Sequence, residues 1–270
     1  MIKNIIFSGA GFKCWAYIGT LRALDEHKTP DLEEIIGVSA GSFFGLLYLL
    51  GIKWDFLLEF FMNLHFKELY DIDIDNILIQ QSLMAGTKFT EIIKEVVSYH
   101  IDPDITFRQL KMYSKIKFTV NALNISDSTL EYFNYNTTPD IKVLDAVRAS
   151  CCLPIIFPPY KIGEKLYYDG GICNNCPIDV VDELNTIAFD LTTWCDNNTS
   201  PINLVNLINS LVNINNKTVQ RENLYTILDD SFKDETFNLN QSRDDIFNLY
   251  MHGYNNTKEL LFKNHVALTY

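Results

Sequence analysis

The sequence predicts an α/β fold with a mostly parallel central sheet. Three observations carry this prediction. A short, mostly apolar segment rich in isoleucine, 2–7, is followed by a glycine-rich turn and an amphipathic helical pattern. The same order of strand, turn and helix returns at 34–50. Two neighbouring strands joined through a helix run in the same direction, because the crossover returns the chain to the same end of the sheet.

The first four elements follow from apolar spacing. The run at 2–7 has the length and composition of a buried strand. A helix is expected at 12–27, where apolar side chains recur at helical intervals. The segment 34–36 is expected as the second strand, and 39–50 as a strongly apolar, buried helix.

The remaining elements are expected in the following order. Residues 54–100 are mostly helical, and a further helix starts at the capping-box pattern of Thr106 and Gln109. Later elements are strands at 117–124 and 129–134, a helix at 140–150 behind an Asp140 cap, a hairpin at 161–168 around Gly163, and a strand at 186–191. From about 203 the chain is rich in Asn but keeps helical apolar periodicity.

Length and composition indicate one domain. The 270 residues are 47% hydrophobic, and no repeat or clear linker interrupts them. We expect a catalytic core at 1–190 and a helical C-terminal section at 191–270 packed on the same domain. The formal net charge of −12 argues against nucleic-acid binding, which needs a basic face, and against tight docking on an anionic membrane.

Targeting signals and cysteines point to the cytoplasm. No signal peptide and no apolar run of membrane-spanning length is visible, so we expect a cytoplasmic protein with at most a peripheral contact with membranes. The six cysteines are then reduced thiols. Cys173 and Cys176 have CxxC spacing, but without a second ligand pair we expect small buried side chains in preference to a zinc or redox site.

The second strand runs directly into Gly37-Val38-Ser39-Ala40-Gly41. This G-x-S-x-G pattern between a strand and a helix is typical of a nucleophile elbow, in which small neighbours make room for a strained serine. The following helix directs the partial positive charge of its N-terminus at developing negative charge. The alternative is a plain strand-to-helix turn with Ser39 as the helix cap.

The first turn, Gly9-Ala10-Gly11-Phe12-Lys13, has the composition of an anion-binding loop. A dinucleotide loop would need a third glycine where Cys14 stands, and an acidic residue after the second strand. A P-loop lysine followed by Ser or Thr is also absent. An oxyanion hole formed by backbone N–H groups therefore fits better than a phosphate site, with an empty tight turn as the remaining alternative.

A third motif, Asp169-Gly170-Gly171, follows the apolar and aromatic run 166–168. It suits either an aspartate presented into a crowded site or an ordinary β-turn. Only His252 and His265 follow this aspartate, and both lie in the helical tail, so a Ser-His-Asp triad has little support.

Taken together, the three motifs and their flanks resemble the patatin-like phospholipase family. The flanks are IGTLRAL at 18–24, VRASCCLPIIFPP at 147–159 and DGGICNNCPID at 169–179. The resemblance covers about residues 1–190 and implies a three-layer α/β/α sandwich. It also implies a dyad of Ser39 and Asp169, an oxyanion hole at Gly9, Ala10 and Gly11, and no metal or cofactor. Ala10 and Cys14 stand where the family usually has glycine.

The resemblance implies a lipid acyl hydrolase that releases fatty acids from phospholipids, as a phospholipase A does, during transient contact with a membrane surface. A neutral-lipid or small-ester hydrolase is the alternative within enzymes. A catalytically weak protein of the same fold that binds a lipid or a partner is the alternative outside them. The oligomeric state stays open.

Three further features have two interpretations each. Lys13 either orients the loop or a phosphate head group, or is a solvated lysine at a helix start. Arg148 is expected to brace loops near the site through hydrogen bonds and not to touch substrate. The aromatic segment 54–66 is expected in the core, with a membrane-facing surface as the alternative.

Overall fold

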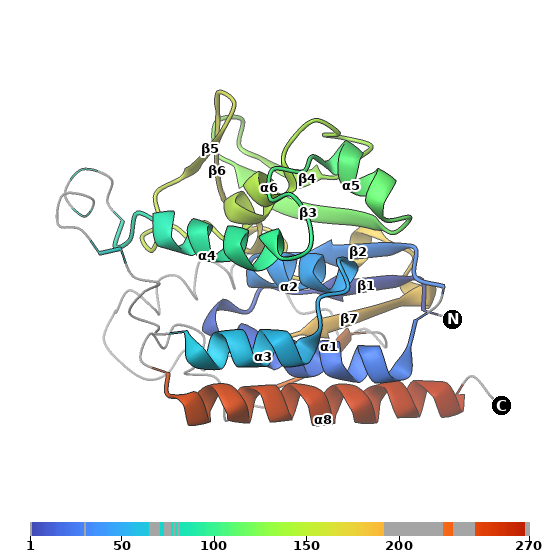
Figure 1. The fold of residues 1–270 in the computed structure, drawn as a ribbon. Coiled ribbons are helices and arrows are strands. Elements are labelled where there is room, and N and C mark those ends of the chain that lie inside the picture. Colours follow the sequence, from blue (N-terminus) through green and yellow to red (C-terminus); the bar gives the residue numbers. More distant parts are fainter. Residues whose placement is uncertain are drawn as a thin grey trace, which may run out of the picture.

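The computed structural model describes residues 2–29, 31–64, 71–72, 77, 79, 82–191, 224–228 and 241–267. The expected α/β fold with a central sheet is confirmed (Figure 1). Its strands are β1 (Asn4–Phe7), β2 (Glu34–Gly37), β3 (Lys117–Asn124), β4 (Thr129–Phe133), β5 (Tyr160–Ile162), β6 (Lys165–Asp169), β7 (Thr186–Asp190) and β8 (Leu224–Thr226).

The helices are α1 (Ala16–His27), α2 (Ala40–Leu49), α3 (Trp54–Asn63), α4 (Thr87–Ser98), α5 (Phe107–Tyr113), α6 (Val143–Ser150) and α8 (Arg243–Ala267). Short 3₁₀ turns are η1 (Gly11–Trp15), η4 (Gly170–Ile172), η5 (Ile178–Val180) and η6 (Glu183–Asn185). The capping box of Thr106 and Gln109 forms as expected. Within the described residues, no helix is long and apolar enough to cross a bilayer.

The parallel part of the sheet is β3-β2-β1-β7-β8, with β1 in the middle. Each of these strands has its carboxyl end at the same edge of the sheet, where α/β proteins place their sites. The loop after β1 and the serine after β2 therefore start at that edge. β4, β5 and β6 form the antiparallel part.

One edge of β3 receives two different strands. Val120 pairs with Phe133 of β4 on one side, so Gly37 of β2 lies on the other. Ala122 likewise pairs with β4, so its second partner, Asp169 of β6, lies on the same edge as β2. Because β6 is antiparallel to β3, β2 and β6 approach each other head to head. Their ends bring the serine motif and the aspartate motif together.

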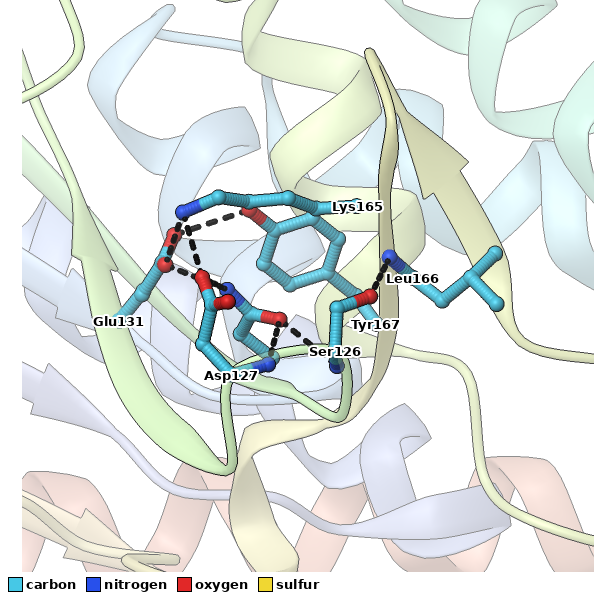
Figure 2. A network of polar contacts seen from close by, with 7 residues as sticks. Ser126, Asp127, Glu131, Lys165, Leu166 and Tyr167 are labelled. Carbon is cyan, nitrogen blue, oxygen red and sulfur yellow. Dashed lines mark hydrogen bonds and ion pairs between the residues drawn. The ribbon is translucent and has the colours of Figure 1, made fainter.

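A polar network fixes β6 against the β3–β4 turn (Figure 2). Lys165 Nζ lies 3.0 Å from carboxylate oxygens of both Asp127 and Glu131. The Tyr167 hydroxyl donates to Glu131 at 2.9 Å, and the Leu166 N–H donates to Ser126 Oγ at 3.0 Å. These bonds hold the register of the strand that ends at Asp169.

The two faces of the sheet are covered differently. The large core cluster joins Ile5, Phe7 and Ile35 to α1, α2 and α6. A second, smaller cluster on the opposite face joins Ile6, Ile36 and Ala188 to Ile178 of η5. Successive side chains of β1 and β2 point to opposite faces of the sheet, which places the two clusters on different faces.

The C-terminal section contributes both a helix and a strand in its described part. α8 runs along α1 (Figure 1), and a Cβ on Gly19 would overlap the backbone of Tyr250 and Tyr254. A Cβ on Gly253 would overlap Ala16 O in the same way. Paired glycines thus let the two backbones approach closely. The helix was expected; β8 was not, and the division at residue 190 stays a prediction.

Candidate active site

Ser39 occupies a sharp turn between β2 and α2. Its φ of 52° and ψ of −133° lie in a region that residues other than glycine rarely adopt. The Ser39 N–H donates to Ser150 Oγ at 2.8 Å, and its carbonyl accepts from the Ser42 N–H and hydroxyl. These bonds satisfy the strained backbone and fix the start of α2, whose N-terminus lies at Ser39.

Both glycines of the G-x-S-x-G motif are required by close packing. A Cβ on Gly41 would overlap the carbonyl oxygens of Phe7 and Ser8 at the end of β1. A Cβ on Gly37 would overlap Ser42 Cα. The elbow is therefore pressed against β1, which brings Ser39 next to the glycine loop.

Asp169 is the last residue of β6 and is 1% exposed. Its N–H donates to Cys152 O at 2.9 Å, and its Oδ1 accepts from the Gly171 N–H at 2.7 Å. Among the described residues, Oδ2 has no hydrogen-bond partner. A buried carboxylate oxygen without a partner is costly, which is typical of a functional site.

Burial raises the pKa of the Asp169 carboxyl from 3.8 to about 7, because the charged form loses its hydration. The nearby Ser39 hydroxyl and the Gly171 N–H act in the opposite direction. Ser39 thus lies close enough to influence the carboxylate, although no formed hydrogen bond joins it to Oδ2. Catalytic hydrogen bonds are often long before substrate binds.

Asn175 ties the aspartate segment to the glycine loop. Its backbone oxygen accepts from the Gly9 N–H at 3.3 Å, and its Nδ2 donates to Gly9 O at 3.2 Å. A Cβ on Gly9 would overlap Asn175 Oδ1 and lie 3.2 Å from Ser39 Cβ. The same amide oxygen lies 2.6 Å from a Cβ built on Gly171. The three motifs predicted to form the site therefore meet around Asn175.

The glycine loop turns into η1. Gly11 has a φ of +55°, which its lack of a Cβ permits. Ala10 has a φ of −136°, so its methyl group introduces no left-handed strain. The first turn bond joins the Lys13 N–H to Ala10 O, so the N–H groups of Gly11 and Phe12 precede the helical bonding pattern. Such groups suit an oxyanion, whereas the Gly9 N–H is committed to Asn175.

An apolar cavity opens beside Ser39. It has a volume of about 120 Å³, and its lining includes the hydroxyl-bearing Ser39 together with Gly11 and Ala40. The rest of its lining is apolar or sulfur-containing and includes the aromatic residues Phe12, Trp15, Phe43, Phe61, Phe89 and Phe157. By its lining, the cavity suits a hydrocarbon chain.

The structure resolves several of the open interpretations. Lys13 is 2% exposed, so a solvated lysine at the helix start is wrong. α3 packs on the core through Leu57 and Phe61, as expected for the described part of 54–66. Cys173 and Cys176 are only half-buried, so the expectation of buried side chains is wrong for this pair.

Two residues of the site lie in the family-like flank 147–159, but the sequence assigned them no role. Ser150 Oγ holds the Ser39 N–H, and Cys152 O holds the Asp169 N–H. Both lie at the C-terminal end of α6. That end therefore contacts the backbone of both candidate catalytic residues, a relationship that depends on tertiary structure.

Comparisons with known proteins agree on family and fold. The model of the patatin-like phospholipase family matches residues 5–182. A curated relative, "Probable lipid hydrolase 463L" of Invertebrate iridescent virus 6, is 31% identical over 185 residues; the match covers 66% of this chain and 62% of the relative's length.

Solved structures give the same picture of the fold. VipD from Legionella pneumophila superposes with a TM-score of 0.60 at 16% identity, covering 97% of this chain and 67% of VipD. The type III effector protein ExoU, of Pseudomonas aeruginosa, gives a TM-score of 0.54 at 15% identity, covering 97% of this chain and 53% of ExoU.

Proposed function

The chain belongs to the patatin-like phospholipase family, and on that premise we propose that it is a lipid acyl hydrolase acting through Ser39 and Asp169. One observation carries this proposal. A buried carboxylate with an unpartnered oxygen lies near the hydroxyl of a strained serine, and that serine lines an apolar cavity. This combination suits attack on an ester whose acyl chain is apolar.

In the proposed acylation step, Ser39 Oγ attacks the ester carbonyl while Asp169 Oδ2 accepts the hydroxyl proton. A carboxylate of ordinary pKa is a weak base toward an alcohol, and the raised pKa of Asp169 reduces that mismatch. The tetrahedral intermediate then collapses, the alcohol leaves with the proton from Asp169, and an acyl-Ser39 ester remains.

In deacylation, water attacks the acyl-Ser39 ester and gives its proton to Asp169. The Ser39 oxygen takes that proton back as the fatty acid leaves. Negative charge on the carbonyl oxygen in both steps is stabilised by the N–H groups of Gly11 and Phe12 and by the N-terminus of α2. One such donor contributes about 2.7–4 kcal/mol in other acyl-transfer enzymes.

We propose phospholipids as the substrate class, reached during transient contact with a lipid surface. The experiment measures fatty-acid release from mixed phospholipid vesicles in EDTA, with triacylglycerol emulsions and a short-chain ester in parallel. Wild type is compared with Ser39→Ala and Asp169→Asn. The controls are Ser98→Ala and Asp140→Asn, which alter side chains outside the site.

Fatty-acid release by wild type and both controls, without release by Ser39→Ala or Asp169→Asn, supports a metal-independent dyad. Release that survives in Asp169→Asn but not in Ser39→Ala would assign the base elsewhere. Preference for triacylglycerol or the short ester would replace the phospholipid assignment. Absence of release together with absence of fluorophosphonate labelling at Ser39 would leave a lipid- or partner-binding role in place of an enzyme.

A further inference from the structure

Arg148, in the last turn of α6, is a cation withdrawn from water. Its side chain is 2% exposed. Among the described residues, no carboxylate lies within ion-pair distance of its guanidinium group. Burying an arginine without an ionic partner is costly, so its contacts need a role that offsets that cost.

Those contacts are aromatic rings, the Thr90 hydroxyl and the Cys152 thiol, to which Nη1 donates at 3.6 Å. The guanidinium carbon lies 4.4 Å from the ring centre of Phe157, 5.3 Å from that of Phe89 and 5.6 Å from that of Tyr160. Nε donates to Thr90 Oγ1 at 2.9 Å. A planar guanidinium both stacks on rings and donates in its plane, which a lysine ammonium cannot reproduce.

Two of the three rings that Arg148 contacts belong to the wall of the cavity. Phe89 on α4 and Phe157 after α6 both line it, and they stack on each other at 5.7 Å with an interplanar angle of 23°. Arg148 therefore lies behind the wall and joins two of the segments that form it, α4 and 153–157. Gly86, at the start of α4, leaves room for the guanidinium, because a Cβ there would overlap Nη2.

The wall segment 153–157 is strained. Ile155 has a φ of 73°, which a β-branched residue rarely adopts. Backbone bonds from Leu83 and Met84 to the carbonyls of Ile155 and Ile156, at 2.7 and 2.9 Å, hold this segment from one side. Arg148 holds it from the other through Phe157. A strained segment keeps its shape only where the surroundings over-determine it.

We propose that Arg148 is a positioning residue that sets the acyl-chain preference of this protein by clamping the cavity wall. The proposal rests on the proposed function. The cavity of about 120 Å³ has room for roughly four groups the size of a water, at about 30 Å³ each. Acetyl and butyryl groups therefore stay near Ser39, whereas medium acyl chains, from octanoyl to dodecanoyl, fill the cavity and contact the clamped wall.

The test measures kcat and KM for p-nitrophenyl esters from acetyl to palmitoyl in wild type, Arg148→Met and Arg148→Lys. Met keeps much of the apolar bulk and Lys keeps the charge. Both are expected to lower the decanoyl-to-butyryl ratio of kcat/KM about 10-fold, mainly through KM for decanoyl. Hydrolysis of butyryl ester and fluorophosphonate labelling of Ser39 are expected to stay within about 3-fold of wild type.

Arg22 supplies the matched control. It is also held between aromatic rings, those of Trp54 and Tyr254, at 4.6 and 4.0 Å. It joins α1 to α3 and α8 and does not line the cavity. Arg22→Met is expected to lower stability without changing the chain-length ratio. If Arg148→Met does not fold, Thr90→Val, which removes only the hydroxyl partner of Nε, takes its place with an expected ratio loss of about 3-fold.

A measurement of fatty-acid binding tests the clamp independently of the proposed hydrolase activity. Decanoate is measured by displacement of a fluorescent fatty acid from Ser39→Ala protein, with and without Arg148→Met. If wild type hydrolyses no ester, the proposed function is wrong, and weaker decanoate binding in the double variant still supports the clamp. A folded Arg148→Met protein with an unchanged chain-length ratio, or an equal loss for all chain lengths, would overturn the clamp.

Discussion

Gly37 and Asp169 end two strands that meet head to head on one edge of β3, opposite Val120 and Ala122. The strand ends are two residues apart along β3, so Ser39, two residues beyond Gly37, reaches the level of Asp169. The spacing of the proposed dyad is therefore set by main-chain pairing. No hydrogen bond through a third side chain is required to place Ser39 near Asp169.

The raised pKa of Asp169 predicts how activity depends on pH. The proposed base must be ionised, so kcat/KM is expected to rise with pH and to reach half its plateau near pH 7, the pKa of the buried carboxyl. A pH–rate profile for a short-chain ester checks this. A profile whose lower limb lies near pH 4 would show that Asp169 keeps its ordinary pKa.

The same carboxyl predicts that the stability of the folded protein falls as pH rises, whereas activity rises. Its folded pKa of about 7 exceeds the unfolded value near 3.8, so its contribution to stability is complete below about pH 4 and is lost as pH rises through 7. Asp169→Asn removes this loss. At pH 8 the variant is expected to unfold with a free energy up to about 4 kcal/mol higher than wild type. Urea unfolding at pH 4 and pH 8 measures the difference in free energy of unfolding between the variant and wild type. An equal difference at both pH values would contradict the prediction.

Ser150→Ala removes the acceptor of the Ser39 N–H. An unsatisfied buried N–H costs about 1–3 kcal/mol, so we expect a loss of stability of that size and about a 10-fold lower kcat as the elbow relaxes. The control is Ser114→Ala, which removes the same kind of bond from the Ile116 N–H outside the site. Equal kcat values in the two variants would show that Ser150 does not hold the elbow for catalysis.

Asn175→Ala removes the Nδ2 bond to Gly9 O between the aspartate segment and the glycine loop. Because the proposed oxyanion donors follow Gly9, we expect kcat to fall about 10- to 100-fold with little change in KM. Asn174→Ala is the neighbouring control, since its amide bonds Asp179 and Tyr132 and not the loop. Parallel rises in KM in both variants would point to a general disturbance of the segment.

Local signals in the sequence predicted most strands correctly. The hairpin around Gly163 forms with Gly163 at φ +60°, and the capping box at Thr106 starts α5. The helix expected from 140 begins instead at Val143. The reason is that Asp140 pairs with Arg108, while Lys142 stays extended at the cap position.

Other features depend on contacts far apart in the chain. β8 is a three-residue strand in an Asn-rich stretch, too short to show periodicity, and it forms by pairing with β7. The roles of Ser150 and Cys152 come from where α6 ends relative to β2 and β6. The burial of Lys13 is likewise a result of packing, and the sequence left a solvated lysine open as an alternative. In each case the local sequence is compatible with more than one outcome.

The glycine contact between α1 and α8 bears on how shortened versions of this chain will behave. The family match ends at residue 182, yet α1, which follows the glycine loop and η1, is covered on its outer side by α8. An expression fragment designed on the family boundary would expose the apolar outer side of α1 to water and aggregate. A premature stop codon or a proteolytic cut ahead of α8 would therefore abolish activity without altering any residue of the site.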